Sequence, residues 1–222
     1  MQPLKDLLLP GERVVSFVGA GGKTTFIYTL ARQLSGWGAR VLVTTTTKMY
    51  PPSRNFMLLG SGRVPPYRHL TVGHEVDPES GKLLGVGPDE IPGLMERFRA
   101  DYVLVEADGA AGRPVKAPEE HEPVVPACSG LVIGVMGLDC LGMAADEATV
   151  FRLEAFLGLT GMEKGGRIGP EHLVALAAHP GGLFKGAPGD ARKLAFHNKA
   201  DLHPRAGRLL GSAMLGWFID AG

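Results

Sequence analysis

The 222-residue sequence predicts an α/β fold: a mainly parallel, doubly wound sheet with helices on both faces. Short apolar, β-rich runs alternate with stretches whose apolar residues recur at helical spacing, and no internal repeat interrupts the alternation. Between the first run and the first helical stretch lies the glycine-rich segment GAGGKTT, residues 19–25. A strand, a glycine-rich loop and a helix in this order are typical of nucleotide-binding loops, so we expect the P-loop NTPase type of fold.

The first two expected strands, residues 13–18 and 39–47, flank a helix whose apolar positions include Phe26, Leu30 and Leu34. Two strands joined by a helix of this length form a right-handed βαβ unit and pair in parallel. Further strands are expected at residues 102–105, 131–135 and 194–196. Further helices are expected at residues 91–100, 147–157, 171–179 and 205–222.

Residues 51–88 differ in character from the rest of the chain. Three short runs, residues 56–59, 69–73 and 82–86, are separated by turn signals such as Asp77-Pro78-Glu79-Ser80-Gly81. This pattern predicts an antiparallel hairpin inserted at the rim of the main sheet. We therefore expect a single domain, residues 1–222, with a β-rich insertion around residues 51–88.

Composition excludes several classes of protein. The chain carries 23 basic and 23 acidic residues, so no global basic field points to nucleic acid as a partner. A hydrophobic content of 45% with 21% charged residues is ordinary for a globular core, and we expect no membrane partner. The first twelve residues show no cationic segment before an apolar core, which indicates a cytoplasmic protein. The spacing of Cys128 and Cys140 matches neither a disulfide framework nor a zinc pair.

The glycine-rich segment has the chemistry of a phosphate-binding loop. Glycines allow backbone N–H groups to surround phosphate oxygens, Lys23 can reach the β- and γ-phosphates, and Thr24 can ligate Mg²⁺. The usual pattern has a further glycine where this chain has Phe17, and the alternative is a structural turn with an incidental lysine. The expected nucleotide-binding residues of the loop are Gly19, Ala20, Gly21, Gly22, Lys23, Thr24 and Thr25.

Two carboxylates, Glu106 and Asp108, follow the expected strand 102–105. Mg²⁺ between phosphates requires hard oxygen ligands, so we expect Asp108 to bind the metal and Glu106 to position water. The alternative is a helix cap or a solvated loop. Arg152 is a candidate charge stabiliser, or else a surface ion pair. The candidate catalytic residues are thus Lys23, Glu106, Asp108 and Arg152, and the candidate metal ligands are Thr24, Asp108 and Glu106.

The segment Asn198-Lys199-Ala200-Asp201 has the form of a guanine-recognition motif. An aspartate here accepts hydrogen bonds from guanine N1–H and the exocyclic amine, and it would be left unpaired opposite adenine. We therefore favour GTP over ATP. The alternative is that Asp201 caps the last helix.

Residues 112–126 combine prolines with charged groups suited to an anionic second ligand, such as a pterin phosphate or another nucleotide. The candidate residues are Arg113, Lys116 and His121. The alternative is a charged, solvated loop.

From about residue 14 to residue 201 the sequence resembles the YqeC family, whose members are described as accessory proteins for selenium-dependent molybdenum hydroxylases. The resemblance is carried by GAGGKTT at 19–25, VTTTTKM at 43–49, LVEADGA at 104–110, KAP at 116–118, HEP at 121–123 and VFR at 150–152. It implies a cytoplasmic P-loop protein that takes part in maturing a molybdenum cofactor, including a selenium-containing form. Its partners would be a molybdopterin-type cofactor and a molybdenum hydroxylase.

A more distant similarity links Glu106, Gly109 and the 198–201 segment to GTPases that load nickel or cobalt cofactors. Those proteins carry Cys or His near the second strand, and residues 44–49 contain neither. The sequence thus predicts a Mg²⁺-dependent nucleoside triphosphatase, with two alternatives: a small-molecule (pterin) kinase, or a nucleotide-gated cofactor-binding module with negligible turnover. It leaves open GTP or ATP, direct handling of selenium or pterin, and the oligomeric state.

Overall fold

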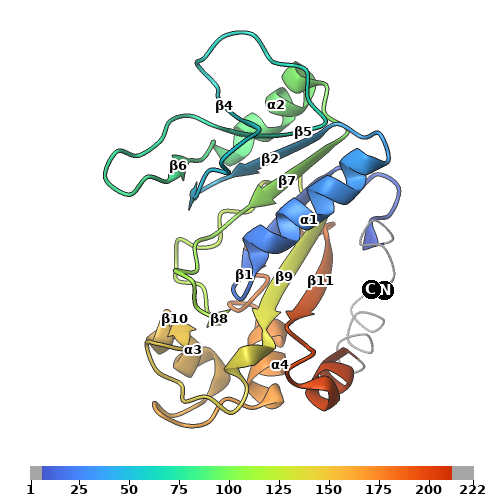
Figure 1. Cartoon of the computed structure of the whole chain (residues 1–222). Helices are drawn as coiled ribbons and strands as arrows, with labels where there is room; N and C mark the ends of the chain where they lie inside the picture. Colours follow the sequence, from blue (N-terminus) through green and yellow to red (C-terminus); the bar gives the residue numbers. More distant parts are fainter. Residues whose placement is uncertain (1–6, 212–222) are drawn as a thin grey trace.

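The computed structural model describes residues 7–211, and its centre is a seven-stranded sheet with the order β11-β9-β1-β7-β2-β5-β4 (Figure 1). Every pairing within this sheet is parallel, which confirms the predicted parallel α/β architecture. The strands are β1 (Val14–Gly19), β2 (Val41–Thr45), β4 (Phe56–Leu58), β5 (His69–Gly73), β7 (Tyr102–Glu106), β9 (Leu131–Gly137) and β11 (Arg192–Asn198).

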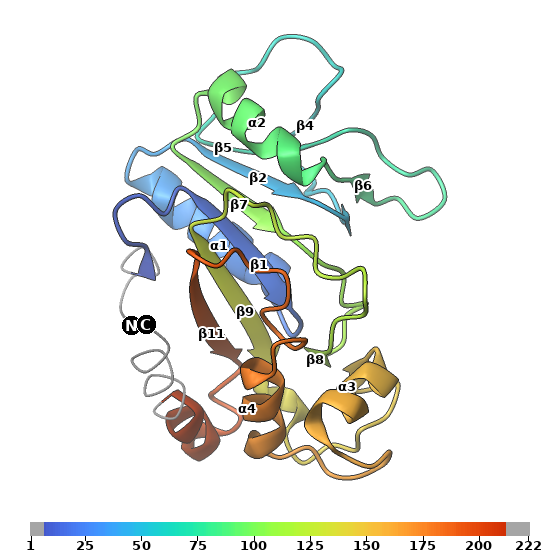
Figure 2. The ribbon, with the colours of Figure 1, turned by 180° about the vertical axis from the view of Figure 1, so that it is seen from behind.

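Helices cover both faces of the sheet, as Figures 1 and 2 show from opposite sides. On one face α1 (Lys23–Gly36) buries Ile27 and Leu30 against the sheet. On the other face α2 (Ile91–Phe98), preceded by η2 (Pro88–Glu90), packs on β2 and β7. A separate cluster joins α3 (Leu153–Thr160), α4 (Pro170–Ala178) and η3 (Leu138–Cys140) to β9.

The first βαβ unit differs from the prediction in one respect. β1 and β2, which precede and follow α1 in the chain, run in the same direction. They do not pair with each other directly, because β7 lies between them and pairs with both. β7 buries Val103, Leu104 and Val105 completely, so both of its faces are apolar. A strand of this kind is most stable in the interior of a parallel sheet, which explains why it separates the two.

The prediction of an inserted antiparallel hairpin over residues 51–88 is wrong for its first two runs. β4 and β5 pair in parallel and extend the main sheet beyond β2. Four of the five residues of β5 are buried, as is typical of a parallel strand covered on both faces. Only the region of the third run folds back: β6 (Leu83–Leu84) pairs antiparallel with β3 (Lys48–Met49), and the Asp77 amide donates to the Lys82 carbonyl at 2.8 Å.

The helix predicted over residues 147–157 begins later, at Leu153. The Asp146 carboxylate accepts hydrogen bonds from the amides of Ala148 and Thr149, which holds a turn there instead. The chain then forms β10 (Val150–Phe151), which pairs in parallel with β8 (Val115–Lys116). The predicted helices around α2 and α4 are confirmed.

Residues 204–211 are helical, and the rest of the helix predicted to residue 222 lies outside the described residues. Residues 1–6, which belong to the segment used above to predict the cellular location, also lie outside them. Within residues 7–211, no helix is long and apolar enough to cross a membrane.

Candidate functional site

The glycine-rich loop lies at the carboxyl end of β1 and leads directly into α1. Gly21 has a φ of +81°, and a Cβ on it would lie 2.3 Å from the Gly137 nitrogen. Gly22 has a φ of +123°, and a Cβ on it would lie 2.3 Å from Asn198 Nδ2. Both positions therefore require glycine, because the backbone is left-handed and the neighbouring strands approach closely.

The loop leaves a group of amides without internal partners. The amides of Gly19, Ala20 and Gly21 donate to Asp108 Oδ2, the Val135 carbonyl and the Arg113 carbonyl. No described residue accepts a hydrogen bond from the amides of residues 22–25, and Gly22 offers α1 no side-chain cap. The start of a helix carries partial positive charge, so this end of α1 attracts an anion.

Lys23 adds a full positive charge at the same point. Its side chain is only 4% exposed, and its ammonium group donates to the Gly19 carbonyl and lies 3.0 Å from Asp108 Oδ1. Asp108, 2% exposed, also accepts from the Gly19 amide through Oδ2 at 3.1 Å. The protein alone thus neutralises Lys23 with a carboxylate from the loop after β7.

Glu106, at the end of β7, faces Thr24: the Thr24 hydroxyl donates to Glu106 Oε2 at 2.8 Å. Burial raises the pKa of Glu106, an effect only partly offset by the Lys23 charge and the Thr24 hydrogen bond. The sequence predicted that Asp108 binds the metal ion and that Glu106 positions a water molecule. Because Asp108 is held by Lys23, Glu106 is the carboxylate that could contact a metal ion beside Thr24.

Replacing Glu106 by glutamine is expected to raise the free energy of unfolding at pH 7 by about 1 kcal/mol, since it removes a buried carboxylate. A carboxyl with a raised pKa costs stability at pH values above that pKa and nothing below its unfolded value of 4.5. The gain should therefore shrink as pH falls toward 4.5. Denaturant unfolding at several pH values measures it, with the exposed Glu79→Gln as control, and equal behaviour of the two variants would contradict the expectation.

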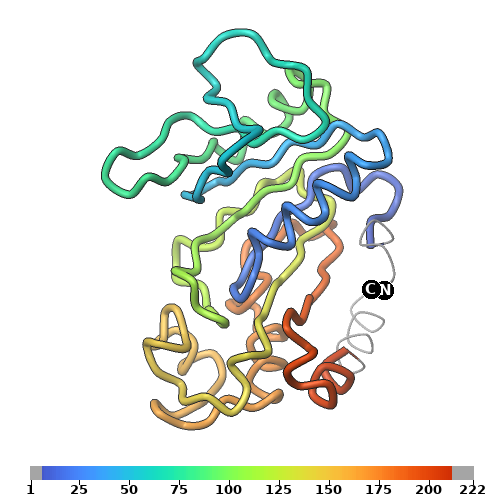
Figure 3. The backbone as a smooth tube through the Cα atoms, in the orientation of Figure 1, coloured from blue at the N-terminus to red at the C-terminus, as the bar shows by residue number. Residues whose placement is uncertain are grey.

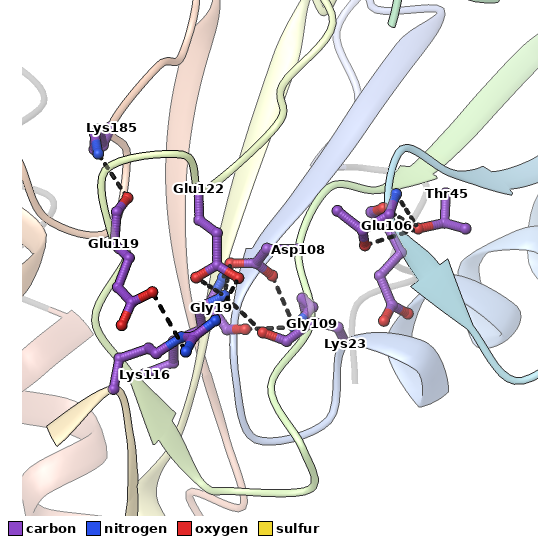
Figure 4. Close-up of polar contacts among 12 residues, drawn as sticks. Gly19, Lys23, Thr45, Glu106, Asp108, Gly109, Lys116, Glu119, Glu122 and Lys185 are labelled. Carbon is purple, nitrogen blue, oxygen red and sulfur yellow. Dashed lines mark hydrogen bonds and ion pairs between the residues drawn. The ribbon is translucent and has the colours of Figure 1, made fainter. Parts of the chain in front are cut away.

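Lys23 and Asp108 begin a chain of alternating charges, which we call the charge chain (Figure 4). Lys116 Nζ lies 3.4 Å from Asp108 Oδ2 and 2.8 Å from Glu122 Oε2, and Lys116 is 1% exposed. Arg152 then lies 3.6 Å from Glu122 and 3.3 Å from Glu119. The order along the chain is Lys23, Asp108, Lys116, Glu122, Arg152 and Glu119.

The pairing of β8 with β10 builds the outer half of the charge chain. It sets Lys116 opposite Phe151, whose ring also stacks under the Arg152 guanidinium at 4.7 Å. Burial by itself would raise the pKa of Glu122, but the Lys116 hydrogen bond and the charges of Lys116 and Arg152 outweigh it and hold the pKa low. Lys185 fixes the same segment by donating to the carbonyls of residues 119 and 120.

The predicted second-ligand residues are not brought together. Lys116 is a buried member of the charge chain, Arg113 Nε donates to the Glu147 carbonyl at 2.7 Å, and His121 is exposed. No hydrogen bond or ion pair joins these three among the described residues. Arg152 likewise reaches Glu119 and Glu122 rather than the glycine-rich loop.

The predicted base-recognition segment does reach the loop. β11 ends at Asn198, whose Nδ2 donates to the Gly21 carbonyl at 2.8 Å. Lys199 has a φ of +60° and pairs with Asp139 at 2.6 Å. Asp201 is exposed, and no described residue at the start of the helix 204–211 hydrogen bonds to it, so the capping alternative gains no support.

Sequence reasoning missed several of the partners that hold the site's charged residues and segments in place. Glu119 and Glu122 lay in a stretch read for its cations, although its mixed charges are a signal for ion pairing. Asp139 and Lys185 carried no signal, since each contacts a segment about 60 residues distant.

In residues 7–211, no group of three or more His, Cys, Asp or Glu side chains is arranged to hold a metal ion.

The fold and site define an α/β protein whose glycine-rich loop, buried lysine and two carboxylates meet at the carboxyl end of a parallel sheet. The family profile described as YqeC protein matches residues 15–154. The chain is similar to "Uncharacterized protein YqeC" of Escherichia coli (strain K12), with 39% identity over 193 residues, 84% of this chain and 75% of the relative. The chain therefore belongs to the YqeC family, as its motifs predicted. No solved structure matches it.

Proposed function

We propose that this member of the YqeC family is a cytoplasmic, Mg²⁺-dependent nucleoside triphosphatase with a preference for GTP. We further propose that it serves as an accessory factor in maturing a molybdenum cofactor and a selenium-dependent molybdenum hydroxylase. The observation that carries the nucleotide proposal is the group of unpaired amides at residues 22–25 beside Lys23. The accessory role rests on the family resemblance.

The charge chain allows phosphate to take Lys23 as a partner. A triphosphate at the start of α1 would compete with Asp108 for the Lys23 ammonium group, which now lies 3.0 Å from the carboxylate. Asp108 would retain the Gly19 amide and Lys116, so it would not become an unpaired buried charge. Binding would then cost one ion pair and gain contacts to several phosphate oxygens.

The residues around Thr24 fit a magnesium ion. The Thr24 hydroxyl and the Glu106 carboxylate are hard oxygen donors 2.8 Å apart, next to the proposed phosphate position. Mg²⁺ is commonly held by one or two protein oxygens together with phosphates and waters, so a larger protein cage is not required. The ion would neutralise charge on the phosphate oxygens, and Glu106 would have to be ionised to hold it.

GTP is expected to bind at least about tenfold better than ATP if Asp201 accepts from guanine N1–H and the exocyclic amine. Asp201→Asn should then shift the preference toward xanthine nucleotides, because the new amide donates to the C2 oxygen of xanthine. Competition titrations with GTP, ATP and XTP measure both effects, with the exposed Asp190→Asn as a matched control. Equal affinity of the unmodified protein for GTP and ATP would contradict the guanine assignment.

Product analysis tests the proposed reaction. The protein is incubated with Mg²⁺ and GTP, alone and with a candidate pterin cofactor and a molybdenum hydroxylase. Free phosphate without any acceptor supports the triphosphatase, whereas a phosphorylated pterin identifies a kinase. Nucleotide binding with turnover at background under every condition would overturn the proposed hydrolysis in favour of a nucleotide-gated binding module.

A further inference from the structure

A hollow of about 920 Å³ lies away from the glycine-rich loop. Its nine lining residues come from three places: residues 63–67 between β4 and β5, residues 97–99 at the end of α2, and Arg40 just before β2. Four of the nine are arginines, and we call this hollow the arginine pocket: Arg40, Arg63, Arg97 and Arg99.

The arginine pocket lies at the amino ends of the parallel strands, and the glycine-rich loop lies at their carboxyl ends. The pocket residues precede β2 and β7, while the loop follows the last residue of β1, and these strands are parallel. The six residues of β1 span roughly 20 Å at about 3.3 Å per residue. Figure 3 shows the segment of residues 63–67 and the turn after β1 at opposite ends of the sheet. One small ligand cannot occupy both places.

The positive charge of the pocket is not neutralised. None of its four arginines forms an ion pair with any residue in the described range 7–211. The Asp101 carboxylate is bound at the backbone, because its Oδ2 accepts from the backbone amide of Arg40 at 2.7 Å. In a chain with 23 charges of each sign, this is a marked local excess of positive charge. The end of α2 adds partial negative charge, but a helix end counts for only about half a unit.

Contacts between different elements hold the walls of the pocket. The Tyr67 hydroxyl donates to the Phe98 carbonyl at 2.8 Å, and the two rings meet edge to face at 6.4 Å. Arg97 donates to the Leu59 carbonyl at 3.0 Å, and its guanidinium lies 5.3 Å from the Phe98 ring centre. Pro65 and Pro66 restrict the facing segment. These contacts hold residue 67 and the end of α2 together, while Arg63, Arg97 and Arg99 are exposed at the pocket.

Arg99 supplies an independent observation. It caps the end of α2 with a φ of 49°, a left-handed position where glycine is strongly favoured. An arginine in this conformation has a higher backbone energy than a glycine, and its side chain loses conformational freedom when it binds a ligand. Strained non-glycine residues cluster at ligand sites, which gives a reason for a guanidinium at the rim of this pocket.

We propose that the arginine pocket binds a small phosphorylated organic molecule. Guanidinium groups match phosphate oxygens in pairs of parallel hydrogen bonds, which accounts for the arginines. The prolines, Val64 and the rings of Tyr67 and Phe98 offer apolar contact for the organic part. The volume is in the range of metabolite-sized ligand sites and larger than a phosphate ion needs.

The test uses pyridoxine 5′-phosphate and its uncharged counterpart pyridoxine, titrated calorimetrically against the full chain. The phosphate ester is expected to bind at least about tenfold more tightly than pyridoxine, because charge-assisted hydrogen bonds are lost with the phosphate. The double variant Arg63→Gln/Arg99→Gln should weaken the ester about tenfold or more. The matched control Arg54→Gln/Arg205→Gln removes the same charge from exposed positions outside the pocket and should change the affinity less than about twofold.

Lys23→Ala separates the two sites, since it should leave pyridoxine 5′-phosphate binding unchanged while weakening nucleotide. Three outcomes would overturn the proposal: no binding of the ester at millimolar concentration, equal losses in the pocket and control variants, or binding lost only with Lys23→Ala. Tighter binding of a polyglutamate peptide or a single-stranded oligonucleotide than of the ester would also overturn it, because the pocket would then serve a macromolecule.

Discussion

Replacing Lys23 by methionine is expected to weaken binding of a nucleoside triphosphate by at least about 30-fold. Removing one partner of a buried, hydrogen-bonded charge pair costs about 2–5 kcal/mol, and about 1.4 kcal/mol corresponds to a factor of ten. Lys23 is 4% exposed and lies where the amides of residues 22–25 converge, so its charge would act on phosphate with little screening by water. Calorimetric titration with a non-hydrolysable GTP analogue measures the loss.

The fold should survive this substitution, because Asp108 keeps the Gly19 amide and Lys116 as partners. Circular dichroism checks that the variant remains folded. Lys164→Met is the matched control, since Lys164 is 58% exposed and pairs with Glu147 at the surface. Lys23→Arg retains the charge and should bind more tightly than Lys23→Met. A folded Lys23→Met variant with the affinity of the control would remove the phosphate-binding assignment.

Replacing Lys116 by methionine is expected to cause a large loss of stability, about 3–5 kcal/mol in the free energy of unfolding. Lys116 is 1% exposed and separates the carboxylates of Asp108 and Glu122. Without it, Asp108 would keep Lys23, and Glu122 would keep Arg152, 3.6 Å away, as its charged partner. Denaturant unfolding at pH 7 measures the loss, and Lys48→Met, which removes an exposed ion pair with Asp77, should cost less than about 1 kcal/mol.

The loss should depend on pH in a defined direction. Glu122 has a lowered pKa in the folded protein, so its ion pairs stabilise the fold above the unfolded value of 4.5. That contribution disappears as pH falls through the lowered folded pKa. The difference between the unmodified protein and Lys116→Met should therefore be largest near neutral pH and smaller in acid.

A compensating substitution gives the sharper form of this test. Lys116→Met/Glu122→Gln should recover part of the lost stability, because it removes a carboxylate left with too little positive charge. Lys116→Met with the stability of Lys48→Met would show that the charge chain contributes nothing to the fold.

The parts of the fold that the sequence predicted are those with strong local signals. β7 and β9 are mostly apolar runs without alternating polar residues, and burial on both faces follows from that composition. The order of the strands could not be predicted from the sequence, because the position of β7 between β1 and β2 depends on packing across the whole sheet. β4 has three residues, too few for any period to distinguish a parallel edge strand from one arm of a hairpin.

The candidate site likewise has parts that could be predicted from the sequence and parts that could not. Glycines, Lys23 and Thr24 lie in one continuous segment, and Glu106 follows directly from the strand before it. Lys116 was predicted to bind an anionic second ligand, with a solvated loop as the alternative, and neither prediction places it in the core, since a lysine is rarely buried unless paired. Its burial arises from the pairing of β8 with β10, residues about 35 apart in the chain, and no local pattern encodes that contact. The arginine pocket was missed for the same reason, because its arginines come from three separate segments.

The most direct test of the central proposal is calorimetric titration of the unmodified protein with a non-hydrolysable GTP analogue, with Mg²⁺ and with EDTA. One molecule of nucleotide should bind per chain, and Mg²⁺ should tighten binding through Thr24 and Glu106 by about tenfold or more. The gain from Mg²⁺ should be lost in Glu106→Ala, while the Lys23 contact remains. Absence of binding to both the GTP and the ATP analogue at millimolar concentration, with Mg²⁺ present, would contradict a nucleotide site at the glycine-rich loop.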